Sequence, residues 1–277
     1  MPLPLLVLFL ACAEAPAPAP SAVTPAPVSA PAASAPAAVP SPALTETQVL
    51  RVLAPSPLEL KARLDGAGIA SDLAPLVPAS RFRTPPASAD VSAIRAGIRT
   101  ADALLAGGGE DKATFLARLR EIRQGMAEIG AGEGLLSSFD DVITKVENDA
   151  ASREDFIAEL DAVTASMVPE QGWGPADTTG PLVQAGAWLA GTDLVAQAVV
   201  KAGSDTAADQ LLRQPEVAEY FLQYARTQGA DKAPGPVRDA LVAALTKLRD
   251  IARLERPLTV ADAQAVHDAA SQLFGFL

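Results

Sequence analysis

Residues 182–203 read LVQAGAWLAGTDLVAQAVVKAG, and this stretch decides the fold class. A helix over it is apolar on nearly every side, but it contains two glutamines and Asp193. A membrane span would hold the Asp193 carboxylate close to its centre, which costs about 2.5–3.5 kcal/mol on insertion scales. A central helix of a bundle needs only that this carboxylate find a hydrogen-bond donor or reach an edge of the bundle. We therefore expect a buried helix, in which Gly186 and Gly191 allow neighbouring helices to approach closely.

Segments with a helical apolar period flank this stretch on both sides and predict further helices. Pro215 is expected to divide one of them, because proline removes a backbone hydrogen bond from the helix interior. No run shows the sustained alternation that is typical of a β-strand. The sequence therefore predicts an all-α fold, an irregular multi-helix bundle of seven or eight helices. The flanking segments are residues 90–107, 110–129, 132–149, 152–168, 204–229, 235–255 and 259–277.

Two short helices are expected within residues 44–68, ahead of this bundle. Ser56 followed by Pro57 is a favourable helix start, because serine caps the first turn and proline fits the first helical position. A Pro-rich stretch then reads as an extended connector. We expect a short helical hairpin and connector at 44–88 and a bundle domain at 89–277. The sequence leaves open whether the early helices pack on the bundle.

Residues 13–43 consist mainly of Ala, Pro, Ser and Val, with nine prolines. Such a segment cannot bury enough apolar surface to offset the entropy lost on ordering. It favours polyproline II at about 3.1 Å per residue, so about thirty residues would reach about 90 Å when extended. We expect a disordered Pro/Ala-rich linker, which is either a spacer that holds the domain off a membrane or a tail without a role.

Residues 1–12 end at Cys12, the single cysteine of the chain, after a short apolar run. This segment resembles the signal peptide of a bacterial lipoprotein, in which a cysteine that follows a small residue is lipidated. Ala11 and Cys12 match that pattern. Phe9 and Leu10 depart from it, and no Lys or Arg precedes Arg51.

Two other interpretations of the first residues stay open. Ala11-Cys12-Ala13 also fits the A-x-A site of ordinary secretion, with cleavage after Ala13. The segment would otherwise be uncleaved or begin further upstream. The linker favours lipidation, because an anchored domain needs a spacer and a free domain does not. The resemblance implies a lipid anchor on the periplasmic side of the cell envelope, with secretion as the alternative.

The charge balance restricts the partners of the chain. Its 22 basic and 33 acidic residues give a net charge of −11. An acidic surface is repelled by phosphate backbones and by anionic lipids, so nucleic acid is excluded as an expected partner. The single cysteine excludes an internal disulfide and a cysteine-based metal cluster. We expect no cofactor and no metal, and a partner that is an envelope protein or a small apolar ligand, besides the membrane reached through Cys12.

No arrangement in the sequence identifies a catalytic residue. His267, the only histidine, lies at the edge of an apolar stripe and reads as structural or exposed, with a pH-sensitive contact or a catalytic base as alternatives. The carboxylates within 140–161 alternate with Lys145 and Arg153, which favours a solvated helical face over a cation site or an acid–base pair. The glycines of LLAGGGEDK (104–112) lack phosphate-loop spacing and predict one helix end followed by one helix start.

Aromatic residues provide the expected binding surface, if the domain has one. Trp173 lies in a Gly/Pro-rich loop and Trp188 follows on the apolar helix, while Tyr220, Phe221 and Tyr224 cluster further on. Exposed aromatics anchor partners, although packing in the core is the alternative. The sequence favours a non-enzymatic, envelope-tethered binding or structural module that presents an acidic domain on a flexible stalk. The alternatives are an enzyme with a carboxylate-based, divalent-metal site across helices, and an unanchored secreted helical protein.

Overall fold

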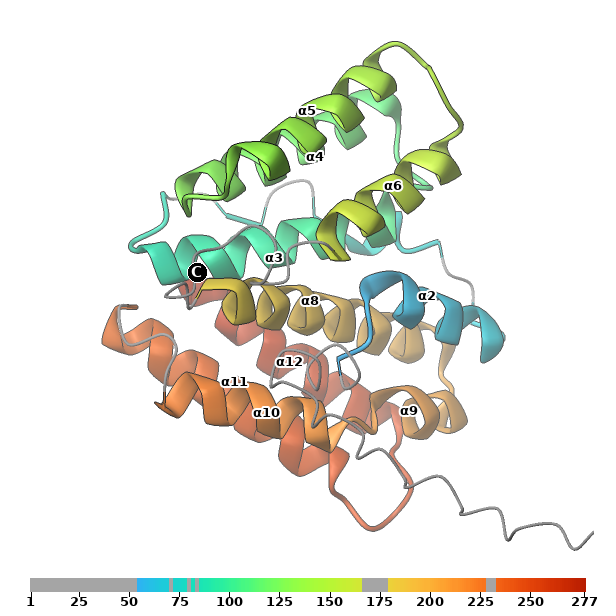
Figure 1. Cartoon of the computed structure of the whole chain (residues 1–277). Helices are drawn as coiled ribbons and strands as arrows, with labels where there is room; N and C mark the ends of the chain where they lie inside the picture. The colour runs from blue at the N-terminus through green and yellow to red at the C-terminus, as the bar shows by residue number, and fades with distance from the viewer. Residues whose placement is uncertain (1–53, 70–71, 79–80, 83–84, 166–178, 228–232) are drawn as a thin grey trace, which may run out of the picture. The chain divides into compact units, whose positions relative to one another are not determined.

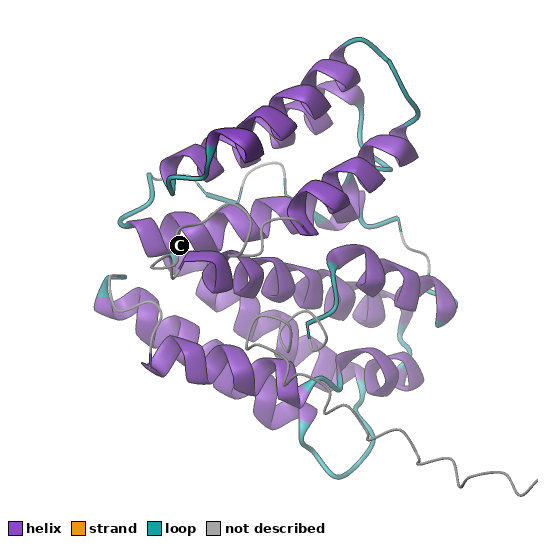
Figure 2. Cartoon of the chain, viewed as in Figure 1, coloured by secondary structure: helices purple, strands orange, loops and turns teal. Residues whose placement is uncertain are grey.

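The computed structural model describes residues 54–69, 72–78, 81–82, 85–165, 179–227 and 233–277. Every regular element in these residues is helical, as the sequence predicts (Figures 1 and 2). The elements are α2 (Pro57–Gly66), the 3₁₀ turn η1 (Ala74–Leu76), α3 (Ala89–Ala106), α4 (Lys112–Glu128), α5 (Glu133–Glu147), α6 (Arg153–Ala165), α8 (Thr179–Ala202), α9 (Asp205–Leu212), α10 (Pro215–Thr227), α11 (Gly235–Ala252) and α12 (Val260–Phe276).

The predicted number of helices is too low. The described residues contain ten α-helices, against the seven or eight expected. Pro215 begins α10 and separates it from α9, which ends at Leu212, so one expected segment forms two helices. Proline fits this position because the first-turn amides of a helix have no intrahelical partner.

The centre of the bundle is the crossing of α3 and α8, where the two backbones touch. A Cβ atom on Gly186 of α8 would overlap the carbonyl oxygen of Ile94 in α3. A Cβ atom on Gly97 of α3 would overlap the carbonyl oxygen of Val183 and lie 2.8 Å from the backbone nitrogen of Ala187. Glycine at both positions therefore permits the close approach predicted for Gly186. Helix α8 is buried along most of its length, as expected of a central helix.

The other helices pack on the two sides of this pair (Figure 1). On the α3 side, α4 packs on α3, α5 packs on α4, and α6 contacts both α5 and α3. On the α8 side, α12 packs on α8, α11 packs on α12, and α10 packs on α11. Helix α12 therefore has α8 on one face and α11 on another.

The early helix α2 belongs to the same core. Its buried Leu60 and Leu64 contact the cluster that α3, α8 and α9 form. Ser56 and Glu59 close a capping box at its first turn, which confirms the helix start predicted at Ser56-Pro57. The other early helix falls within residues 1–53, outside the described residues, as do the linker and Cys12.

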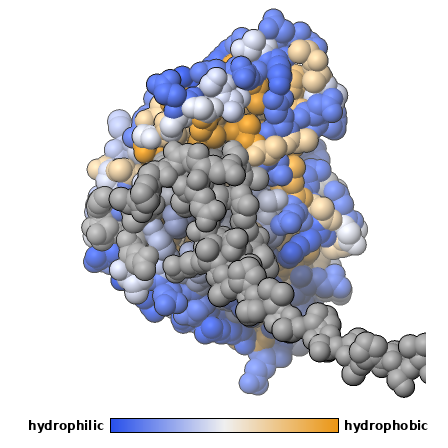
Figure 3. All heavy atoms as spheres, viewed as in Figure 1, coloured by the Kyte–Doolittle hydropathy of each residue, from blue (hydrophilic) through white to orange (hydrophobic). Residues whose placement is uncertain are grey.

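The described helices include none that is both long enough and apolar enough to cross a membrane. In α8 this agrees with the interpretation of residues 182–203 as a buried bundle helix. Hydrophilic residues make up most of the described surface visible in Figure 3.

Candidate functional site

Four titratable side chains form one network between α3, α8 and α12. Arg81, from the connector between α2 and α3, donates from Nε and Nη2 to the two carboxylate oxygens of Asp102, at 2.8 and 3.1 Å. Arg81 Nη1 lies 3.5 Å from Oδ2 of Asp193. The other oxygen of Asp193, Oδ1, lies 2.6 Å from Nδ1 of His267, and Gln197 donates to Oδ2 at 3.0 Å. The Arg81, Asp102 and Asp193 side chains are only 9%, 3% and 0% exposed.

The Arg81 guanidinium joins three helices at one point. It forms a fork with Asp102 on α3 and an ion pair with Asp193 on α8, and its central carbon lies 4.8 Å from the ring centroid of Phe274 on α12. A guanidinium at this distance over an aromatic face is attracted by the ring quadrupole. One residue of an irregular segment therefore fixes α3, α8 and α12 relative to one another.

Burial and charge oppose each other in this network. Burial raises the pKa of the Asp102 carboxyl above its usual range, because loss of water penalises the charged form more than the charge of Arg81 offsets. Burial also acts to lower the pKa of Arg81, but the attraction and hydrogen bonds of Asp102 and Asp193 outweigh it, and the net shift is upward. Arg81 is therefore the positive centre that makes two buried carboxylates tolerable.

The histidine has an aspartate and a serine nearby, but not in the arrangement of a hydrolytic triad. A triad needs the aspartate on one imidazole nitrogen and the nucleophile on the other. Ser271 Oγ lies 3.4 Å from Nδ1 of His267, the same atom that faces Asp193. A carboxylate only accepts hydrogen bonds, so Nδ1 donates to Asp193 and cannot accept a proton from Ser271. The geometry orients the imidazole and does not activate a nucleophile.

The sequence indicates part of this network. It predicts that Asp193 either finds a donor or reaches an edge, and the structure provides partners from His267, Gln197 and Arg81. His267 contacts the buried carboxylate of Asp193, which fits its interpretation as a structural residue. The expectations from the sequence do not include Asp102 or Arg81. Asp102 follows Ile98 by four residues on the apolar stripe of its helix, and this spacing was a readable signal that a buried carboxylate needed a partner.

The described aromatic residues of the predicted binding surface lie in or against the core, which is the alternative that the sequence left open. Trp188, Phe221 and Tyr224 are buried, and Tyr220 is partly buried against the same core. Trp188 packs on Phe221 with ring centroids 5.7 Å apart and donates from Nε1 to Gln214 at 3.0 Å. Indole rings are buried readily when their N–H finds a partner, and Gln214 supplies it. Trp173 lies outside the described residues.

The carboxylates within 140–161 lie on helix faces in contact with solvent, as predicted for a solvated face. Asp140 forms a fork with Arg123, and Lys145 pairs with Glu159 at 2.5 Å. Their basic partners neutralise them locally, in place of a cation. Within the described ranges no cluster of three or more His, Cys, Asp or Glu side chains is arranged to hold a metal ion.

The glycine-rich stretch 104–112 ends one helix and starts another, as predicted. Gly107 caps the C-terminus of α3, and Asp111 caps α4 by accepting from the backbone N–H of Thr114 at 2.9 Å. Between them, Glu110 forms a buried ion pair with Arg118, whose Nε donates to it at 2.7 and 2.9 Å. Carboxylates at this turn leave no place for a phosphate.

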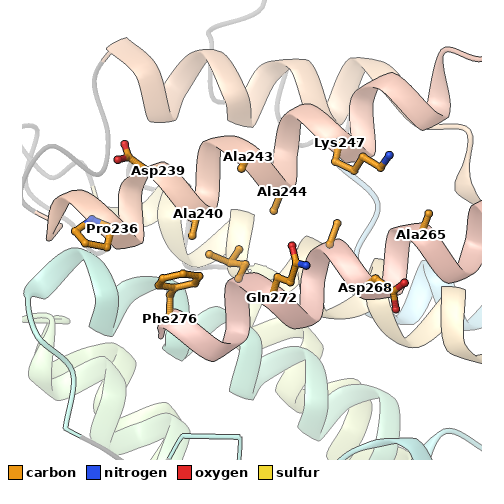
Figure 4. Close-up of a pocket in the computed structure, with 12 residues that line it drawn as sticks. Pro236, Asp239, Ala240, Ala243, Ala244, Lys247, Ala265, Asp268, Gln272 and Phe276 are labelled. Carbon is orange, nitrogen blue, oxygen red and sulfur yellow. The ribbon is translucent and has the colours of Figure 1, made fainter.

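A groove lies between α11 and α12 (Figure 4). Its volume is about 870 Å³, and most of its lining is apolar. Alanines from both helices line it, together with the polar side chains of Asp239, Lys247, Asp268 and Gln272 (Figure 4). Phe276, at one end of the groove, is the single large apolar side chain of the described residues that is mostly exposed, at 55%.

Comparison of the chain with protein-family models, with curated proteins and with solved structures gave no match. The functional interpretation therefore depends on the site geometry and on the sequence.

Proposed function

We propose that this chain is a non-enzymatic helical binding or structural module, tethered to the cell envelope and presenting an acidic domain on a flexible stalk. The observation that carries the proposal is that the charged side chains of the buried network form ion pairs and hydrogen bonds with one another. Hydrogen bonds and ion pairs join three helices through four side chains, which are Arg81, Asp102, Asp193 and His267. Charged groups that pair between helices support a structural role for this part of the domain.

The tether is supported by the order of segments along the chain. A short apolar run, a cysteine after alanine and a long Pro/Ala-rich segment precede the helical domain. A lipid on Cys12 would hold the domain to a membrane, and an extended spacer would allow it to reach a partner at a distance. A second lipid chain or a further contact is needed for a stable anchor, since one acyl chain binds only reversibly.

Mass spectrometry of the mature N-terminus tests the tether. The full chain is expressed in a Gram-negative host, and the membrane fraction is compared with that of the C12S variant. We expect a lipidated N-terminal Cys12 in the parent, and loss of the lipid and of membrane retention in C12S. An unmodified N-terminus at Glu14 with protein free in the medium would show that the chain is secreted without an anchor.

A further inference from the structure

We infer that the groove between α11 and α12 binds a second copy of this chain, so that the domain self-associates through this face. The inference deepens the proposed non-enzymatic role and names its partner. It is carried by the shape of the groove and by the order of charges along it.

The α11 side of the groove permits close packing of two helices. Ala240, Ala243 and Ala244 lie along it, and Ala243 is exposed (Figure 4). Helix axes approach to about 8 Å where the side chains at the contact are small. Phe276 stands at one end of the groove and adds an exposed apolar ring to this face.

Opposite charges on α11 meet when two copies of this helix are related by a two-fold axis. Asp239 and Lys247 lie four residues before and four residues after Ala243, one at each end of the alanine stretch (Figure 4). Eight residues span about 12 Å of helix, so the two side chains cannot pair within one chain. Two α11 helices packed antiparallel across Ala243 bring each Lys247 beside the Asp239 of the other copy. A two-fold interface makes this pair twice.

A second copy fits this charge pattern better than an unrelated acidic protein. The chain carries a net charge of −11, so two copies repel one another unless opposite charges meet at the contact. Lys247 is the one basic side chain that lines the groove, and the two-fold arrangement uses it on both sides. The Asp239 side chain is 77% exposed, and its one ion pair among the described residues is a 3.9 Å contact with the adjacent Arg238. Its carboxylate is therefore available to a partner.

Charge exchange tests the pairing. The full chain carrying C12S, which removes the lipid site, is measured by sedimentation equilibrium at low ionic strength. We expect a dimer whose dissociation constant rises by at least about tenfold in D239K and in K247E, because each places like charges together. The double variant D239K/K247E should recover most of the affinity. D141K and K201E, which change exposed charges on α5 and α8, should leave it unchanged.

Crosslinking at the expected axis gives an independent measurement. With Cys12 replaced, the variant A243C contains a single cysteine, and a residue on a two-fold axis faces its own copy. Two Cβ atoms within about 4.5 Å can form a disulfide, so A243C should yield a covalent dimer under mild oxidation. A cysteine at exposed Ser137 on α5 serves as the control and should remain mostly monomeric.

Three results would overturn the inference. The first is a parent chain that is monomeric at every concentration reached. The second is a dimer whose dissociation constant does not change in either single charge reversal. The third is a double variant that is folded by circular dichroism but does not recover the association. Because these measurements use the chain without lipid, they do not depend on the tether. A lipidated but monomeric protein would refute self-association alone, and a dimer without a lipidated Cys12 would refute the tether alone.

Discussion

Replacing Gly186 with alanine should destabilise the domain, although alanine is the better helix former by about 0.8–1.0 kcal/mol. The gain in helix propensity requires space for the added Cβ. At Gly186 that atom would overlap the carbonyl oxygen of Ile94 and lie 3.0 Å from its carbonyl carbon and 3.2 Å from its Cα. All three are backbone atoms of α3, which cannot rotate away as a side chain does. Helices α3 and α8 would therefore have to separate.

The size of the effect follows from that separation. The nearest atom, the carbonyl oxygen of Ile94, would lie 2.1 Å from the added Cβ. Non-bonded atoms pack best at about 3.5 Å, so the helices must move apart by more than about 1 Å, which forfeits about half of each dispersion contact across the crossing. Overpacking of a core costs about 1–3 kcal/mol. Because the obstacle is backbone, we expect G186A to lose about 2 kcal/mol of unfolding free energy, or about 4–8 °C in Tm.

Urea denaturation followed by circular dichroism measures this change in the full chain carrying C12S. The matched control is G134A in α5, where an added Cβ meets no atom within 4 Å. It should stabilise the domain by up to about 1 kcal/mol through helix propensity alone. If G186A were as stable as the parent or more stable, α3 and α8 would not cross at this glycine, and the packing argument would be wrong.

Three further perturbations separate the kinds of contact in the domain. D102A leaves the guanidinium of Arg81 buried without its bidentate partner and should lower the free energy of unfolding, measured by urea denaturation, by about 3–5 kcal/mol. D140A breaks an equally bidentate but exposed pair and should lower it by about 0–1 kcal/mol. Equal losses in the two variants would contradict the role given to burial. Hydrogen bonds from its arginine partner and from the first turn of α12 hold the pKa of Asp262 below its usual range, so its contribution to stability is complete above about pH 4 and is lost as pH falls through its lowered pKa. D262N should therefore be less stable than the parent at pH 7, with a gap that narrows below pH 4, and a gap that is constant with pH would refute this. Arg213 donates to the backbone carbonyls of residues 252, 254 and 256, at 3.3, 2.7 and 2.9 Å, so R213A should accelerate amide hydrogen exchange in the loop before α12, and unchanged exchange would show that the loop holds itself.

The sequence predicts the helical class well, because the relevant signals are local. The apolar stretch 182–203 indicates a buried helix, and Pro215 marks a boundary that the structure confirms. The capping contact between Ser152 and Asp155 at the start of α6 is equally local, with the backbone N–H of Asp155 donating to Ser152 Oγ at 3.2 Å. Each of these features depends on residues within one or two turns of one another, and the chain order alone specifies them.

The interior network depends on distances along the chain that no local pattern encodes. Arg81 lies in a Pro-rich connector without periodicity, 21 residues from Asp102 and far from Asp193 in sequence. Its long side chain reaches the core from an irregular segment, so its role depends on how α3 and α8 pack. The burial of Trp188 also depends on contacts that are distant in the sequence. The partner of its indole is Gln214, 26 residues away, and only the packed structure shows that α10 covers the ring.

The buried network and the open groove lie on two different faces of the same helix, α12. On α12, His267 bonds to Asp193 of α8, and Phe274 lies under the guanidinium of Arg81. These contacts fix the rotation of α12 about its own axis, because an unpaired Asp193 in the interior would be costly. Successive helical residues differ by 100° in direction, so fixing His267 also fixes where the next residue, Asp268, and the exposed Phe276 point. The charges that hold the core together therefore determine which side chains of α12 line the groove.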